Sequence, residues 1–261
     1  MKLSIIIVTY NDCNYLRRCT DSIYGKLEGF LDWEIIIVNN DKNQDVRNLS
    51  LDFSKIKLVD HRENGGFGSG INLGAKKAKG EFLLILNPDT EMIMDNIQDV
   101  LNKFSEDKVL GIIGGGIIDR KGKKQEWSAG RELSLYDLVR NNLGISRSRF
   151  IWDSNNSMEC DWVAGTVMFI ERKVFNQLGG FDERFFMYFE DMDLCRRVRK
   201  SGKKVMFFPE MQVFHGNGKS YEDKRLQKKH YYDSMEQYFG KKHGQMSRML
   251  VKLVRNIIIR K

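Results

Sequence analysis

Short, almost continuous runs of Ile, Val and Leu alternate with segments of helical periodicity through the first half of the chain. Such runs predict strands buried on both faces of a parallel sheet, and they occupy Leu3–Thr9, Glu34–Asn39, Ile56–Asp60, Glu81–Leu86 and Val109–Ile113. Between them, apolar residues recur at helical spacing, at Leu16, Cys19, Ile23 and Leu27 and again at Ile93, Ile97, Leu101 and Phe104. This alternation predicts an α/β fold with a mostly parallel central sheet flanked by helices, whose ligands bind at the carboxyl ends of the strands.

The pattern weakens from Gly114 to about Cys160, where three consecutive glycines and a polar run predict an excursion with a mobile part. Order returns in the last third. Here we expect a strand over Asp161–Ile170, helices over Glu171–Leu178 and from near Glu190 to Ser201-Gly202, and strand-like pieces at Lys204–Phe208 and Gln212–Phe214.

The sequence of the tail, residues 241–261, predicts a basic amphipathic helix. Apolar residues share one face, while the opposite face is basic and no acidic residue follows Glu236. The apolar face comprises Met246, Met249, Leu250, Leu253 and Ile257, and the basic face comprises Arg248, Lys252 and Arg255. Such a helix either docks on the folded domain or lies in a membrane interface.

The formal net charge of +8 is compatible with nucleic acid, an anionic membrane or a phosphorylated substrate, and also with an ordinary solvated surface. Four cysteines without a Cys-x-x-Cys pair favour a reducing, cytoplasmic location. No apolar run approaches the roughly 20 residues of a membrane span, so we expect none.

Three polar positions are candidates for chemistry. Asp89 follows an apolar run and could hold a divalent cation, although Asn87-Pro88-Asp89 is also typical of a turn. Asp191 and Glu190 follow an aromatic run and could include a general base, although acidic residues are common at helix starts. His215 follows a strand-like piece, and a metal role for it depends on proximity to Asp89.

The segment Gly65-Gly66-Phe67-Gly68-Ser69-Gly70 resembles a phosphate-binding loop. It does not form the tight first turn of a dinucleotide fold, because the first strand is followed by Thr9-Tyr10-Asn11. A nicotinamide-dependent oxidoreductase is therefore disfavoured. A nucleic-acid-binding module is disfavoured as well, because the basic excess lies largely in the tail and not among exposed aromatic residues.

Five segments in this order resemble family 2 glycosyltransferases with the GT-A fold, and within them the rhamnosyltransferase-like branch. The resemblance extends from about Lys2 to His243. The segments are Ser4–Asn11, Glu34–Asn40, Glu63–Gly74, Leu84–Thr90 and Gly179–Cys195.

The resemblance implies roles for particular residues. The donor nucleotide sugar would contact Thr9, Tyr10, Asn11, Asn39, Asn64, Gly68, Asn72 and Asn87. Asn39 stands where the family usually has an aspartate that accepts the pyrimidine N3–H, and an amide carbonyl can still accept that bond. Asp89 matches the last aspartate of the family's metal motif for Mg²⁺ or Mn²⁺, and His215 matches a further ligand, whereas Asn87 replaces the first aspartate.

The same resemblance makes Asp191 the catalytic base, with Glu190 and Trp162 on the acceptor side. It implies one GT-A domain over residues 1–240, with a Rossmann-like nucleotide-sugar half over about 1–115 and an acceptor half over about 116–240. The predicted function is inverting transfer of a sugar, rhamnose from dTDP-rhamnose or a UDP-sugar such as UDP-galactofuranose, to a glycan or lipid-linked acceptor. The tail helix would bind the anionic inner face of the cell membrane.

Overall fold

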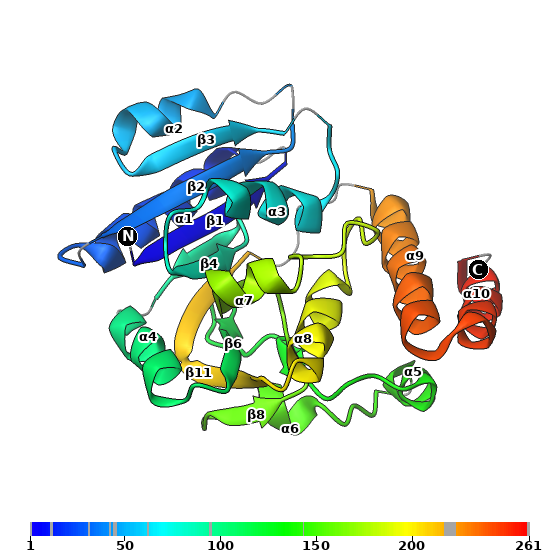
Figure 1. Ribbon diagram of the computed structural model, residues 1–261. Helices are drawn as coiled ribbons and strands as arrows, with labels where there is room; N and C mark the ends of the chain where they lie inside the picture. Colours follow the sequence, from blue (N-terminus) through cyan, green and yellow to red (C-terminus); the bar gives the residue numbers. More distant parts are fainter. Residues whose placement is uncertain are drawn as a thin grey trace.

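A computed structural model describes residues 2–10, 13–30, 32–41, 43, 46–61, 63–93, 96–142, 144–216 and 223–259. The predictions for Asn11 and for the side chain of Ile257 lie outside this description. One large sheet with strand order β3-β2-β1-β4-β10-β6-β11-β5, and with β8 beside β11, forms the centre of the molecule (Figure 1). Its strands are β1 Leu3–Thr9, β2 Trp33–Asn39, β3 Ile56–Asp60, β4 Phe82–Leu86, β5 Thr90–Met92, β6 Leu110–Ile118, β8 Met158–Cys160, β10 Val167–Glu171 and β11 Lys204–His215.

The sheet is mostly parallel, as predicted. Strands β3, β2, β1 and β4 are parallel neighbours, and β6 and β11 are parallel to each other. Strand β10 lies antiparallel between β4 and β6. Strands β7 (Ala129–Gly130) and β9 (Trp162–Val163) form a separate two-stranded sheet.

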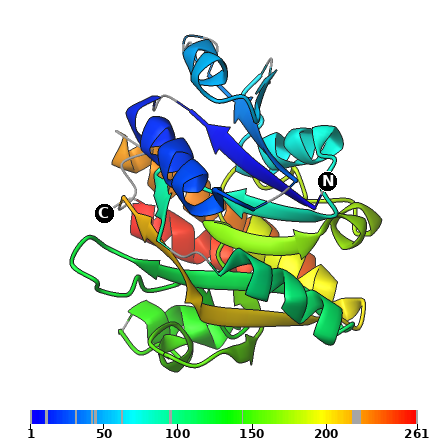
Figure 2. The same ribbon diagram turned by 90° about the vertical axis from the view of Figure 1, so that its left-hand side faces the viewer.

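Helices cover both faces of the large sheet, because the buried strands alternate their side chains between two apolar clusters. Ile5 and Ile7 of β1 lie in the cluster that includes residues of α1, α2 and α4, which Figure 2 shows from that side. Ile6 and Val8 lie in the other cluster, with residues of α3, α7, α8 and the two C-terminal helices. The helices are α1 Cys13–Leu27, α2 Arg47–Asp52, α3 Phe67–Lys77, α4 Ile97–Glu106, α5 Leu135–Asn142, α6 Arg149–Trp152, α7 Arg172–Gln177, α8 Glu190–Lys200, α9 Lys224–His243 and α10 Gln245–Ile259.

Two glycine-rich segments differ from their predictions. The three glycines from Gly114 to Gly116 lie inside strand β6, where a Cβ on Gly114 would stand 2.3 Å from Val163 Cβ and one on Gly115 would stand 2.3 Å from the Met211 carbonyl oxygen. These glycines therefore permit close packing and do not begin an excursion. The phosphate-loop-like segment is also largely helical, because α3 begins at Phe67.

Three other elements differ as well. The strand predicted over Asp161–Ile170 is divided between β9 and β10. The two last strand-like pieces form one strand, β11, with a register shift between Phe208 and Gln212. Helix α9 was not predicted, because its apolar, aromatic and basic residues are not segregated by helical period.

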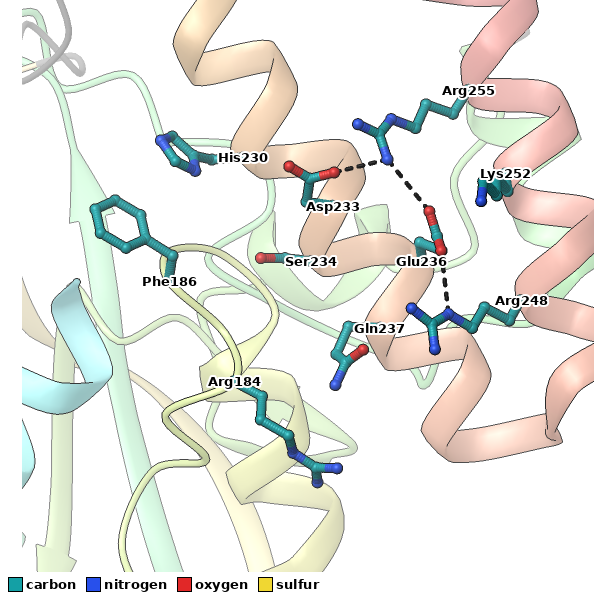
Figure 3. Close-up of a pocket in the computed structure, with 10 residues that line it drawn as sticks. All are labelled: Arg184, Phe186, His230, Asp233, Ser234, Glu236, Gln237, Arg248, Lys252 and Arg255. Carbon is teal, nitrogen blue, oxygen red and sulfur yellow. Dashed lines mark hydrogen bonds and ion pairs between the residues drawn. The ribbon is translucent and has the colours of Figure 1, made fainter. Parts of the chain in front are cut away.

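The tail is helical, and two arginines of its basic face form ion pairs with α9. Arg248 Nε lies 3.1 Å from Glu236 Oε1, and Arg255 Nη1 lies 2.7 Å from Asp233 Oδ1 and 3.2 Å from Glu236 Oε2, so α10 is paired with α9 (Figure 3). Both arginines are therefore engaged with acidic residues of α9, and binding of the tail to a membrane stays a prediction. Val251 is buried against this side of the protein.

The predicted apolar face of α10 is open to solvent. Met246 is 85% exposed and Leu253 is 62% exposed, and Met249 and Leu250 are exposed beside them. The alternative that this face is simply core is therefore wrong for these four side chains. In the part of the chain that is described, no helix has both the length and the apolarity needed to cross a bilayer.

Candidate active site

The carboxyl ends of β1, β2 and β4 bring three of the predicted donor-binding residues to one edge. Thr9 and Asn39 are direct partners in the parallel register of β1 and β2, and Asn87 follows β4 on the other side of β1. Thr9 is fully buried, and its Oγ1 has no hydrogen-bond partner among the described residues. A buried polar atom without a partner is costly, so this hydroxyl is a polar group whose satisfaction the described residues do not supply. Tyr10 follows it and is 52% exposed.

A network of amides joins the end of β2 to the loop before α3. Asn39 Oδ1 accepts a hydrogen bond from the Asp41 N–H at 3.0 Å. Asn40 Nδ2 donates to Asn64 Oδ1 at 3.2 Å and to the Gly66 carbonyl at 3.1 Å. Asn64 therefore holds the loop that borders this edge. Asn40 ends one of the five segments that carry the family resemblance, but the sequence alone predicted no role for it.

Asn72 joins helix α3 to the segment around Phe181 through side-chain hydrogen bonds. Its Nδ2 donates to the Phe181 carbonyl and to Glu183 Oε1, each at 2.9 Å, and its Oδ1 accepts from the Phe181 N–H at 2.8 Å. These bonds join α3 to the turn that leads toward Asp191. Gly68 is buried where a Cβ would stand 3.0 Å from Phe181 Cβ, so its position favours a residue without a side chain.

Asp89 and His215 lie face to face. Asp89 Oδ1 is 3.2 Å from His215 Nε2, and both side chains are nearly buried. His215 Nδ1 lies 2.7 Å from Gln125 Oε1. Because an amide oxygen can only accept, Nδ1 carries the proton and donates to Gln125. Nothing in the sequence pointed to Gln125, which is 90 residues away along the chain.

This arrangement fits a divalent cation. Asp89 Oδ1 is buried and lacks a hydrogen bond of good geometry within the described structure. His215 Nε2 faces this oxygen, and a nitrogen and an oxygen at such a distance can both bind one cation that lies between them. The described residues contain no group of three or more His, Cys, Asp or Glu side chains that could hold a metal ion.

Asp191 is held at the N-terminus of α8 by backbone donors. Its Oδ2 accepts from the Gly165 N–H at 3.0 Å and its Oδ1 accepts from the Met192 N–H at 2.7 Å. Burial raises the pKa of this carboxyl above its usual range, and the two N–H donors oppose the shift. A carboxyl whose pKa is raised by burial is a stronger base than an ordinary aspartate, and such a group is suited to accept a proton.

Glu190 lies beside it and is 5% exposed. Burial and then the neighbouring charge of Asp191 raise the pKa of Glu190 well above its usual range. Its Oε2 has no hydrogen-bond partner in the described part of the protein. In this pair the protonated, neutral form of Glu190 is favoured, whereas two backbone N–H groups stabilise the ionised form of Asp191. Different environments separate two carboxyl groups in this way at other active sites.

The backbone that leads into α8 is strained. Tyr188 has φ 70° and Phe189 has φ 65°, which is unusual for bulky aromatic residues. Helix α9 holds this approach, because Ser234 Oγ donates to the Met187 carbonyl at 2.7 Å and Gln227 Nε2 donates to Tyr188 Oη at 2.9 Å. Strain of this kind is concentrated at functional sites.

Trp162, predicted to line the acceptor side, is 5% exposed. Its Nε1 donates to the Arg131 carbonyl at 2.9 Å, and its ring belongs to the apolar cluster. The structure therefore gives Trp162 a packing role, and its contact with an acceptor stays a prediction. Another tryptophan of this region, Trp127, is 38% exposed.

Comparisons with known proteins concern the family and the fold of the chain. The family model described as glycosyl transferase family 2 matches residues 4–177, and one described as the N-terminal domain of galactosyltransferase matches residues 147–218. The low-salt glycan biosynthesis hexosyltransferase Agl10 of Haloferax volcanii is 28% identical over 207 residues, which are 78% of this chain and 63% of that protein. The chain thus spans less than two thirds of that relative's length.

A second relative is the N-acetylglucosaminyl-diphospho-decaprenol L-rhamnosyltransferase of Mycobacterium tuberculosis, with 25% identity over 82% of this chain and 75% of that protein. Among solved structures, the mannosyltransferase PcManGT from Pyrobaculum calidifontis, in complex with GDP-Man and Mn²⁺, aligns with a TM-score of 0.65 and 17% identity. This alignment covers 92% of this chain and 63% of that one. At this identity the structural similarity supports the fold alone.

Proposed function

Because the chain belongs to glycosyl transferase family 2, we propose that it transfers a sugar from a nucleotide diphosphate to a hydroxyl group of a glycan or lipid-linked acceptor. The predicted GT-A glycosyltransferase fold is confirmed by the sheet topology and the structural similarity. The observation that carries the proposal is the position of Asp191, a carboxylate with a raised pKa, fixed by two backbone donors at the start of α8.

In the proposed reaction, Asp191 accepts the proton of the acceptor hydroxyl while that oxygen forms a bond to the anomeric carbon. The bond between this carbon and the donor's phosphate oxygen breaks, and its electron pair leaves with the nucleotide diphosphate. Attack opposite the leaving group inverts the anomeric configuration without a covalent enzyme intermediate. Thr9 and the amides beside it bind the nucleotide.

Asp89 and His215 would hold Mg²⁺ or Mn²⁺. The supporting observation is the unsatisfied Asp89 Oδ1 that faces His215 Nε2 at 3.2 Å. When bound, such a cation would neutralise charge on the departing diphosphate. Gln125 orients His215 by accepting the bond from Nδ1, in the manner of outer partners that orient metal-binding histidines.

The donor we propose is dTDP-rhamnose, with UDP-sugars such as UDP-galactofuranose as the alternative. The rhamnosyltransferase relative supports the first. Asn39 lies at the carboxyl end of β2, at the position where the family resemblance implies recognition of the pyrimidine of either nucleotide. Direct titration of the protein with dTDP and with UDP compares the two bases.

The function is tested with a panel of nucleotide sugars and acceptor glycosides, each with Mg²⁺ or Mn²⁺, by measuring release of nucleotide diphosphate and formation of the glycoside product. We expect release that depends on the acceptor and on one donor. Retention on DNA that falls with salt, together with no turnover on any donor, would instead favour the nucleic-acid-binding alternative.

We also propose that α10 attaches the protein to an anionic membrane. The exposed Met246, Met249, Leu250 and Leu253 form an apolar stripe on this helix. Lys252 is exposed on the same helix and lines, together with cationic and acidic residues, a pocket of about 380 Å³ between the loop at Arg184, α9 and α10 (Figure 3). Each basic group near an anionic surface contributes roughly 1 kcal/mol, and an apolar helix face adds acyl-chain contact.

Sedimentation with vesicles tests the attachment. The wild type should sediment with phosphatidylglycerol vesicles at low salt, be released at high salt, and remain in solution with phosphatidylcholine. The double variant Leu250→Asp, Leu253→Asp should stay in the supernatant yet keep its turnover of a water-soluble acceptor. Tyr136→Asp, which changes an exposed aromatic residue of α5, is the control. Equal loss in the control, or no sedimentation of the wild type, contradicts the attachment.

A further inference from the structure

Trp127 occupies an unusual position for its size. It has φ 63°, in the left-handed region that bulky residues avoid, and its side chain is 38% exposed. Its ring packs against the buried Trp152, with centroids 5.1 Å apart and an interplanar angle of 42°. The structure therefore maintains a large aromatic ring, supported from one side, at a strained position where part of it meets solvent. Persistent strain of this kind points to function.

The segment that carries Trp127 connects the two chemical centres of the site. Two residues earlier, Gln125 binds His215, which faces Asp89. On the other side, the Ser128 carbonyl accepts from the Ala164 N–H at 2.8 Å, in continuation of the pairing of β7 with β9. Ala164 precedes Gly165, whose N–H binds Asp191. Trp127 directly precedes Ser128 in this segment, and Ala164 directly precedes Gly165.

We propose that Trp127 is the platform on which the acceptor sugar stacks, a site for a pyranose ring beside Asp191. This inference rests on the proposed glycosyl transfer. A pyranose presents several C–H groups on one face, and the negative face of an indole attracts such groups while both surfaces leave water. Trp162, with 5% exposure, offers far less ring area for this contact.

The position favours the acceptor over the donor. The donor-binding edge is formed by the ends of β1, β2 and β4, whereas Trp127 follows β6 and directly precedes Ser128, which pairs with the segment that holds Asp191. The hydroxyl that loses its proton to Asp191 belongs to the acceptor. An exposed ring beside the segment that holds this carboxylate therefore contacts the sugar that bears that hydroxyl.

Steady-state kinetics with octyl glycosides as acceptors test the platform. Trp127→Ala should raise the acceptor KM about tenfold, with the donor KM and kcat changed less than about twofold, and Trp127→Phe should restore most of the acceptor affinity. Tyr136→Ala removes an exposed aromatic ring of α5 and should change neither KM. An unchanged acceptor KM in Trp127→Ala, or a rise in the donor KM instead, overturns the proposal.

A further variant separates binding from folding. Trp127→Gly loses the stacking on Trp152 but adopts the left-handed backbone without strain, so we expect it to fold and to lose acceptor affinity. Binding of the octyl glycosides without a donor, measured by calorimetry, is independent of turnover. If the wild type binds a glycoside and Trp127→Gly does not, the stacking role of Trp127 is supported even when no donor gives turnover. If both proteins bind the glycoside equally, the stacking role is contradicted, whereas the proposed glycosyl transfer is not.

Discussion

Replacing Asp191 by asparagine removes the proposed proton acceptor and keeps its size. Positioned general bases contribute about a hundredfold or more to the rate, equivalent to at least about 2.7 kcal/mol of activation free energy. The two backbone N–H groups of Gly165 and Met192 each bind one carboxylate oxygen. An amide accepts from one of them and faces the other with its NH₂ group, which costs about 1 kcal/mol. We therefore expect turnover to fall at least about a hundredfold while nucleotide binding is retained.

The same substitution has an expected effect on stability. Burial raises the pKa of Asp191, so the protonated form is favoured in the folded state. Its contribution to stability is present below the unfolded pKa and is lost as the pH rises through the raised folded pKa. An asparagine at this position does not ionise and does not undergo this loss. The variant should therefore gain stability relative to the wild type as the pH rises toward neutral, apart from the constant amide cost.

Asp182→Asn is the matched control with the opposite sign. Arg184 holds the pKa of Asp182 well below its usual range, so this carboxylate stabilises the fold above its unfolded pKa and loses the effect as the pH falls. Its asparagine variant should be less stable than the wild type at neutral pH, and the difference should shrink in acid.

The assay combines turnover, nucleotide titration and urea unfolding at several pH values. Wild-type turnover should decline as the pH falls through the raised pKa of Asp191. Asp191→Asn with wild-type turnover, or with the same acid decline as the wild type, refutes the assignment of the base. Loss of nucleotide affinity together with turnover indicates instead a disturbed donor site.

Two further predictions concern the metal and the approach to α8. In Asp89→Asn, calorimetry should detect no increase of nucleotide affinity on adding Mg²⁺ or Mn²⁺. The wild type should bind nucleotide more tightly with metal, and so should the control Asp60→Asn, which changes an exposed carboxylate at the end of β3. An equal response to metal in all three proteins contradicts the metal site. Gly66→Ala would place a Cβ 2.0 Å from the Phe186 carbonyl at φ 88°, so it should lower stability by about 1–3 kcal/mol and reduce turnover, while Gly25→Ala, with open space around it, should do neither in urea unfolding and turnover assays.

Local patterns in the sequence predicted the elements that depend on local physics. Strands β1 and β3 have the predicted bounds, and β2 begins one residue earlier, because continuous β-branched runs favour strands wherever both faces are covered. Helix α8 begins at Glu190 as expected, since acidic residues suit a helix N-terminus. Where glycines mark close packing, as in β6, the local pattern gave the wrong structure, because the neighbours that require them are distant in sequence.

The five segments in their order along the chain sufficed to predict the family and the fold class, and the roles of Asp89 and Asp191 stay predictions. Their partners depend on tertiary contacts. Gln125 contacts His215 only because β11 and the segment after β6 are brought together, and such a contact has no period along the chain.

The tail shows the same division. Its sequence determined an amphipathic helix with one apolar and one basic face, because the 3.6-residue period is local. Which face turns inward was decided by α9, where Glu236 and Asp233 bind Arg248 and Arg255 and leave the apolar stripe outside. Ion pairs between elements depend on where other helices lie. The sequence therefore determined the two faces of the helix, and the tertiary structure decided their orientation.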